Sequence, residues 1–283
     1  MRIKRYLRRR LSLGNLLKWA VALVWFVVTV LPVWWMFNVV FSQGVQVSLS
    51  PHLYPTSLSA GVENIRLVLT GSPFLRNYLV SFAFAFVQIT GMLLVCSMAA
   101  YEFALFWFPG KEPIFLVAIS ALMVPSIVTL IPTYRIVVKL GWLNSLQGLA
   151  VPGIASAFGL FLLRQFMENL PRELMDAAEI DGASHFGVYW YVALPLSSNG
   201  LITLSVLGFM FVWGSYLWPL VIATKANWYP VSLAVASYLN YQSWVPINIV
   251  MAASLLGALP PIIVYVFLQH FIVEGVALTG LKA

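Results

Sequence analysis

The sequence has few charged residues and very little cysteine. Asp, Glu, Lys and Arg make up only 9% of the 283 residues, whereas 61% are hydrophobic and the mean hydropathy is +0.90. A soluble domain typically carries about 25% charged residues. This shortage of charge argues against a water-soluble enzyme and predicts a protein whose solvent is the lipid bilayer.

The residue types that form metal and catalytic sites are also scarce. Cys96 is the only cysteine, which excludes an intrachain disulfide, and it lies in an apolar stretch where a small core residue is expected. The three histidines, His52, His185 and His270, fall in different segments, and we expect His185 to be solvated. The chain has no H-E-x-x-H, G-x-S-x-G or G-x4-G-K-[ST] motif. The sequence therefore predicts no metal site and no catalytic residues, and a chain that is not itself an ATPase.

Long apolar runs are what the sequence does contain. Each is long enough to cross about 30 Å of hydrocarbon as a helix, and they lie near residues 18–41, 77–105, 113–134, 146–167, 197–222 and 246–271. We predict an all-α membrane protein with one six-helix domain over residues 18–271. Residues 1–17 would form a basic N-terminus and residues 272–283 a tail. Prolines inside the runs predict kinks or breaks, at Pro125, Pro132, Pro152, Pro219, Pro260 and Pro261.

The basic residues predict the orientation. Seven of the 16 Lys and Arg residues fall within the first 18 positions, directly before an apolar run. This pattern favours a cytoplasmic N-terminus on anionic lipid over a nucleic-acid surface, and six spans then place the C-terminus in the cytoplasm too. A cleavable signal peptide is the alternative. The run from Trp19 to Phe41 is too long for one and no small-x-small site follows, so we expect an uncleaved first span.

An acidic segment at residues 168–191 interrupts the apolar pattern. It holds five of the nine acidic residues, namely Glu168, Glu173, Asp176, Glu179 and Asp181. Pro171 suits a helix start, Gly182 suits a turn with positive φ, and Ser184 suits the N-cap of a second helix. We predict a helix, a turn and a helix on the cytoplasmic face. By composition alone, an ordinary solvated loop is the alternative.

The spacing within this segment resembles a known signature. Asp176, Ala177, Ala178, Gly182, Val192, Leu194 and Pro195 follow the EAA-x3-G-x9-I-x-L-P pattern of permease subunits of ATP-binding-cassette (ABC) importers. The resemblance extends to Asn77, Asn144, Met123 to Ser126 and Phe161 to Phe166. Within the carbohydrate branch, the chain is similar to the maltose-permease G-subunit family.

The resemblance implies a fold, partners and roles. It implies a type I importer core in the inner membrane, paired with a second similar permease, two ATPase subunits and a periplasmic or lipid-anchored solute-binding protein. ATP and Mg would bind to the ATPase subunits and no cofactor to this chain. The segment at 171–186 would be the coupling helix that docks on an ATPase. The implied coupling residues are Glu173, Asp176, Ala177, Ala178, Asp181, Gly182, Leu194 and Pro195.

The solute and its path are predicted less directly. Polar and aromatic positions within the runs are candidate contacts, with helix packing as the alternative for each: Gln88, Ser126, Trp213, Tyr216, Trp218 and Asn248. No Lys or Arg lies deep in a predicted span, which favours a neutral sugar, polyol or glycoside over the alternative substrate glycerol-3-phosphate. The resemblance also places a binding-protein contact in the outer loop at 224–244, at Trp228 and Tyr229, where membrane-interface residues are the alternative.

Two other classes of function compete with this interpretation. A self-contained secondary transporter or channel typically carries ionisable groups inside its spans, and here only Glu102 does so, near a span end. Such a protein would also leave the coupling signature unexplained. An intramembrane enzyme needs Asp pairs or Ser-His arrangements that the sequence lacks.

Overall fold

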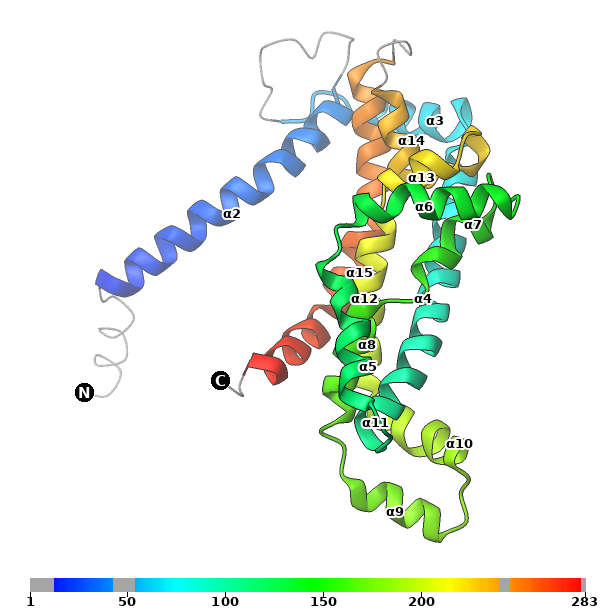
Figure 1. The fold of residues 1–283 in the computed structure, drawn as a ribbon. Coiled ribbons are helices and arrows are strands. Elements are labelled where there is room, and N and C mark those ends of the chain that lie inside the picture. The colour runs from blue at the N-terminus through cyan, green and yellow to red at the C-terminus, as the bar shows by residue number, and fades with distance from the viewer. Residues whose placement is uncertain (1–12, 43–53, 240–244, 281–283) are drawn as a thin grey trace, which may run out of the picture. The chain divides into compact units, whose positions relative to one another are not determined.

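The computed structural model describes residues 13–42, 54–239 and 245–280, and the regular structure within these ranges is helical (Figure 1). The chain divides into two compact units. The first comprises residues 1–72 and 238–256, and the second comprises residues 73–237 and 257–283. Most of the basic N-terminus, together with His52, Tyr241, Trp244 and Lys282, lies outside the described residues.

The first unit contains α2 (Leu13–Val40), α3 (Leu58–Gly71) and the start of α15 (Ile247–Gly280). Buried Asn64 holds these helices together, because its Nδ2 donates to the Val40 carbonyl at 2.8 Å while its Oδ1 accepts from Asn248 Nδ2 at 2.7 Å. Such amide bonds between helices are favourable where no water competes.

The second unit is built around α4 (Phe74–Leu105), an unbroken helix of 32 residues without proline. Its buried side recurs with helical period along the whole length, as in Phe84, Gln88, Met92, Cys96 and Tyr101. Small residues let other helices approach it closely. A Cβ on Gly208 of α12 (Ser198–Trp213) would lie 2.7 Å from Met92 Cε, for example.

Two of the predicted spans are broken. Helix α5 (Lys111–Ser120) and the short η1 (Ala121–Met123) meet α6 (Ser126–Lys139) at 99°. Helix α7 (Leu146–Ala150) and η2 (Val151–Gly153) meet α8 (Ala157–Met167) at 49°. The first break follows from Pro125, since Val124 before it adopts an extended conformation. The kinks or breaks predicted within the runs at 113–134 and 146–167 are therefore confirmed.

Proline does not interrupt every helix that contains it. Helix α6 continues through Pro132 and α15 continues through Pro260 and Pro261. In a bundle, neighbouring groups can satisfy the carbonyls that a proline leaves free. The prediction of breaks is thus confirmed near Pro125 and Pro152, and also near Pro219, where residues 214–216 leave the helix.

The fifth span and the chain that leads into it differ most from the prediction. Helix α9 (Arg172–Ile180) is followed by α10 (His185–Val188), a π-helical turn η3 (Tyr189–Ala193) and α11 (Leu194–Leu196), which meets α12 at 72°. The span predicted at 197–222 ends at Trp213. Gly214 to Tyr216 are not helical, and the helix resumes as α13 (Leu217–Ile222). The predicted outer loop holds η4 (Ala226–Trp228) and α14 (Val231–Tyr238).

The lengths and compositions agree with a membrane protein. Three helical stretches suffice to span a bilayer, Leu17–Val40, Phe74–Leu105 and Ile247–His270, and the described residues contain up to six spans if each bent pair counts as one. The predicted class, an all-helical membrane protein, is confirmed.

Candidate functional site: an exposed acidic helix and an uncharged cavity

The acidic segment folds as a helix, a turn and a helix, as predicted. Gly182 has φ +88°, the left-handed conformation that glycine adopts at no steric cost, and Ala183 N donates to Ala178 O at 2.9 Å to close the turn. Ser184 caps α10 by accepting from Gly187 N at 3.2 Å. Pro171 directly precedes α9 and acts as its N-cap residue.

One side of this segment is anchored and the other is open. Met175 is buried with Met167 and Leu163, and Ala178 and Leu194 pack against the same cluster. Glu173, Asp176, Ala177, Asp181, Gly182 and Pro195 are all exposed. Exposed apolar side chains accompany the acids, with Ile180 86% and Phe186 60% accessible. Acidic and apolar groups side by side are suited to a protein partner with a basic rim.

A buried arginine fixes the end of α8, just before this segment. Arg164 donates to Glu112 Oε1 and to Glu168 Oε1, both at 2.7 Å, and its guanidinium lies 3.9 Å from the centre of the Phe115 ring. Its side chain is only 9% exposed. The charge is paired twice, so α5 and α8 are joined by a network rather than by a single surface ion pair.

His185 is exposed, as expected, with 52% of its side chain accessible, but it also has a partner that the sequence does not show. Its Nε2 lies 2.8 Å from Glu102 Oε1, and its ring lies 4.1 Å from that of Phe106. The two residues are 83 positions apart. Sequence inspection missed the pair because nothing in the spacing shows that α10 packs beside the end of α4.

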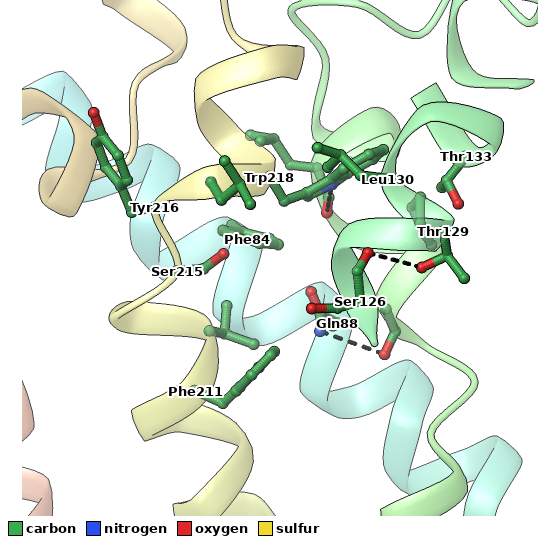
Figure 2. Close-up of a pocket in the computed structure, with 15 residues that line it drawn as sticks. Phe84, Gln88, Ser126, Thr129, Leu130, Thr133, Phe211, Ser215, Tyr216 and Trp218 are labelled. Atoms are coloured by element: carbon green, nitrogen blue, oxygen red, sulfur yellow. Dashed lines mark hydrogen bonds between the residues drawn. The ribbon is translucent and has the colours of Figure 1, made fainter. Parts of the chain in front are cut away.

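A cavity of about 380 Å³ lies among the broken helices of the second unit (Figure 2). Its wall includes Ser126 at the start of α6, Gly153 at the end of η2 and Ser215 between α12 and α13, so three of the helix breaks border it. None of its 15 lining residues is charged. Broken helices with exposed polar backbone are where transporters commonly place their solute sites.

Gln88 gives the cavity a fixed acceptor. The side chain is 7% exposed, and its Nε2 donates to the Gly153 carbonyl at 3.3 Å, so the amide oxygen is on the side away from that carbonyl (Figure 2). A Cβ on Gly153 would lie 2.2 Å from Gln88 Nε2, so the glycine leaves the room that the amide occupies. The arrangement suits the hydroxyl donors of a ligand.

Four of the six predicted solute contacts line this cavity: Gln88, Ser126, Tyr216 and Trp218. Trp213 does not, since it packs edge-on against Phe82 at 4.9 Å and donates to the Gly257 carbonyl. Asn248 belongs to the first unit, where it donates to Asn64.

Other lining residues were missed, or named only as packing. Thr129 and Thr133 follow Ser126 at helical spacings of three and seven, a polar stripe that can be read from the sequence once α6 is known to start at Ser126. Ser215, Phe84 and Phe211 carry no such signal. Their place in the wall depends on where α12 ends.

Two asparagines hold the segment that was predicted to contact a binding protein. Buried Asn77 donates to the carbonyls of Ala226 and Tyr229, each at 2.8 Å. Asn144, at φ +52°, accepts from Thr224 N and Lys225 N. Trp228 and Tyr229 are half-buried, and Arg76 lies 5.9 Å from the Trp228 ring. The segment at 224–230 is therefore fixed to α4 and to the turn after α6.

These features define a class of protein: a multi-span helical transport subunit with an exposed acidic helix and an uncharged cavity at its helix breaks. The chain belongs to the family of binding-protein-dependent transport system inner membrane components, whose model matches residues 92–277. The members of that family are multi-pass permease components of ABC import systems. It thereby confirms the non-catalytic permease role, and it favours this role over a self-contained transporter or channel.

Several curated relatives share one name. The chain is 35% identical over 232 residues to the sn-glycerol-3-phosphate transport system permease protein UgpE of Yersinia pestis bv. Antiqua (strain Antiqua), covering 80% of each chain. It is 38% identical over 208 residues to the protein of that name in Pectobacterium atrosepticum, covering 72% of this chain and 73% of the relative. It is 28% identical over 278 residues to that of Rhizobium meliloti, covering 94% and 97%.

A solved structure shares the fold. A chain of a bacterial ABC transporter involved in the import of the acidic polysaccharide alginate superimposes with a TM-score of 0.80 at 19% identity, covering 91% of this chain and 95% of that one. This likeness confirms the predicted importer-permease fold. Membership of a binding-protein-dependent system implies partner ATPase and binding-protein components.

Proposed function

We propose that this permease carries a neutral sugar, polyol or glycoside and is driven through the segment at 171–186, by ATP and Mg bound to separate ATPase subunits. The assembly would comprise a second similar permease, two ATPase subunits and a periplasmic or lipid-anchored solute-binding protein. The observation that most directly supports a neutral solute is the uncharged cavity at the helix breaks.

The exposed side of the acidic segment supports the coupling role. Asp176 and Glu173 are free to meet basic groups, while Met175 fastens α9 to the core so that a push on the segment reaches the spans. Gly182 supports the same role, since an added Cβ would meet nothing within 4 Å and a partner surface can approach the backbone.

Co-purification tests this role with a matched pair of variants. Gly182→Arg and Gly141→Arg both put arginine at a position with positive φ, +88° and +69°, and with no neighbour within 4 Å of the added Cβ. Only the first lies in the acidic segment. We expect the ATPase to be lost from Gly182→Arg and retained by Gly141→Arg. Equal retention by both would contradict the coupling role.

The cavity supports a neutral solute. Gln88, Ser126 and Thr129 bring hydroxyl and amide groups to the wall of the same cavity that the aromatic residues Tyr216 and Trp218 line. Hydrogen-bonding groups combined with aromatic faces suit a sugar or polyol, whereas a phosphate ester is ordinarily held by Arg or Lys. The second candidate substrate is sn-glycerol-3-phosphate, favoured by the names of the relatives.

Uptake into liposomes that hold the whole complex separates the two candidates. We would compare labelled maltose and glycerol with labelled sn-glycerol-3-phosphate, and Thr129→Val with Ser120→Ala. Ser120 is exposed and bonds only to Val117 of its own helix. Neutral uptake that falls in Thr129→Val alone is the expected result. Uptake of the phosphate ester alone would overturn the neutral assignment and leave the coupling role standing.

We place the termini and the segment 171–186 in the cytoplasm, and the segment 224–230 on the outer side with the binding protein. The basic N-terminus supports this orientation. Asn77 and Asn144 anchor the segment 224–230 through Thr224, Lys225, Ala226 and Tyr229, which supports a preformed contact surface. Deletion of residues 227–229 is expected to weaken docking of the binding protein and leave ATPase binding intact.

A further inference from the structure

Three side chains near the end of α4 bind the second helix of the acidic segment. Ser97 Oγ and Tyr189 Oη form a hydrogen bond of 2.8 Å, Tyr101 Oη donates to the His185 carbonyl at 3.3 Å, and Glu102 accepts from His185 Nε2 at 2.8 Å. We call these five residues the α4 ladder.

Three of the five residues of the α4 ladder are buried. Ser97, Tyr101 and Tyr189 are 1%, 2% and 3% exposed, and the rings of Tyr101 and Tyr189 lie 5.3 Å apart. Breaking a buried hydrogen bond leaves both partners without water to replace it. The second helix of the segment is therefore held to α4 by bonds that are costly to break.

Helix α4 also borders the cavity, on a face roughly opposite to the one that carries Ser97. Phe84 and Gln88 line the cavity, and Gln88 precedes Tyr101 by 13 positions, which is about 20 Å of helix. Helix α4 has no break between these points, and in Figure 1 α10 lies at one end of α4 while α7 and α13 lie at the other. A displacement of the ladder is thus carried unchanged to Gln88.

The stretch of chain that joins the ladder to α12 is less regular than α4. Between the ladder and α12 lie a π-helical turn, Pro195 without an amide hydrogen, and a 72° bend at Ser197. Within the described structure the buried Ser197 hydroxyl has no hydrogen-bond partner. These features are typical of a hinge.

We propose that α4, held by the ladder, transmits movement of the coupling segment to the cavity wall at Gln88, while the bend at Ser197 absorbs the motion on the α12 side. The proposal rests on the coupling role proposed above. It makes Ser97 and Tyr189 positioning residues for transport, although neither lines the cavity nor belongs to the exposed face.

The test measures the cavity wall directly and needs no knowledge of the solute. In a Cys96→Ala background, Gln88→Cys places a single thiol of this chain in the wall. The rate at which a maleimide labels this thiol is measured in the purified full complex. The complex without nucleotide is compared with the complex trapped by ATP and vanadate. The comparison is repeated with Ser97→Ala, Tyr189→Phe and both together, and with Tyr191→Phe as the control. Tyr191 is 79% exposed in the same π-helical turn.

The double variant separates linkage from stability. Ser97→Ala leaves the buried Tyr189 hydroxyl without its partner, and Tyr189→Phe leaves Ser97 only its bond to the Leu94 carbonyl. The double variant removes both hydroxyls and can be nearly neutral for folding. We expect the nucleotide-dependent difference in labelling to be lost in the double variant as in the singles, and to persist in Tyr191→Phe, with ATPase co-purifying throughout. A double variant that recovers the full difference overturns the α4 proposal. Failure of the unmodified chain to co-purify an ATPase would instead overturn the coupling role.

Discussion

At the scale of single residues, Arg164 has the largest predicted effect on stability. Its side chain is 9% exposed and bonds Glu112 and Glu168. Arg164→Met leaves both carboxylates without their partner, and the expected loss is about 2 kcal/mol, below the 3–5 kcal/mol of fully buried pairs because the acids are partly exposed. Thermal melting in detergent measures it. Arg66→Met is the control, since Arg66 and Glu63 are solvated and 3.7 Å apart; equal melting temperatures would contradict the assignment.

A second prediction at this scale concerns Asn77. Asn77→Asp keeps the shape but replaces the donor with an acceptor facing the carbonyls of Ala226 and Tyr229. We expect faster hydrogen exchange across 224–230 and weaker docking of the binding protein, at least as severe as in Asn77→Ala. Unchanged exchange in the Asp variant would show that Asn144 alone holds the segment.

At the scale of elements, the turn between α9 and α10 depends on backbone conformation more than on space. Gly182 has φ +88°, and an added Cβ meets nothing within 4 Å. Asn tolerates this conformation, whereas a β-branched residue does not. We expect Gly182→Asn to retain the ATPase and Gly182→Val to lose most of it, as measured by co-purification. Loss in both variants would mean that the partner surface excludes any side chain at the bend.

At the scale of the whole molecule, orientation is the property to test. In a Cys96→Ala background, Ala226→Cys and Glu179→Cys each put one exposed thiol in the outer segment or in the acidic segment. A membrane-impermeant maleimide is expected to label position 226 in intact cells and position 179 only after permeabilisation. The reverse pattern would invert the proposed topology.

The sequence alone determined the class of protein, the positions of the apolar runs and the helix, turn and helix of the acidic segment. These follow from local causes: hydropathy over about twenty residues, a proline before α9, and a glycine and a serine at the turn. Four of the six residues predicted to contact the solute also line the cavity, so the sequence located part of the cavity wall.

Only the tertiary structure decided where helices break and which distant residues meet. Proline divides the chain at Pro125 but not at Pro132, because packing decides which freed carbonyls are satisfied. His185 meets Glu102, Tyr189 meets Ser97, and Asn77 meets the segment at 224–230, across 83 to 152 positions. Hydropathy does not predict such pairings, since they arise from helix faces that come together only when the bundle forms.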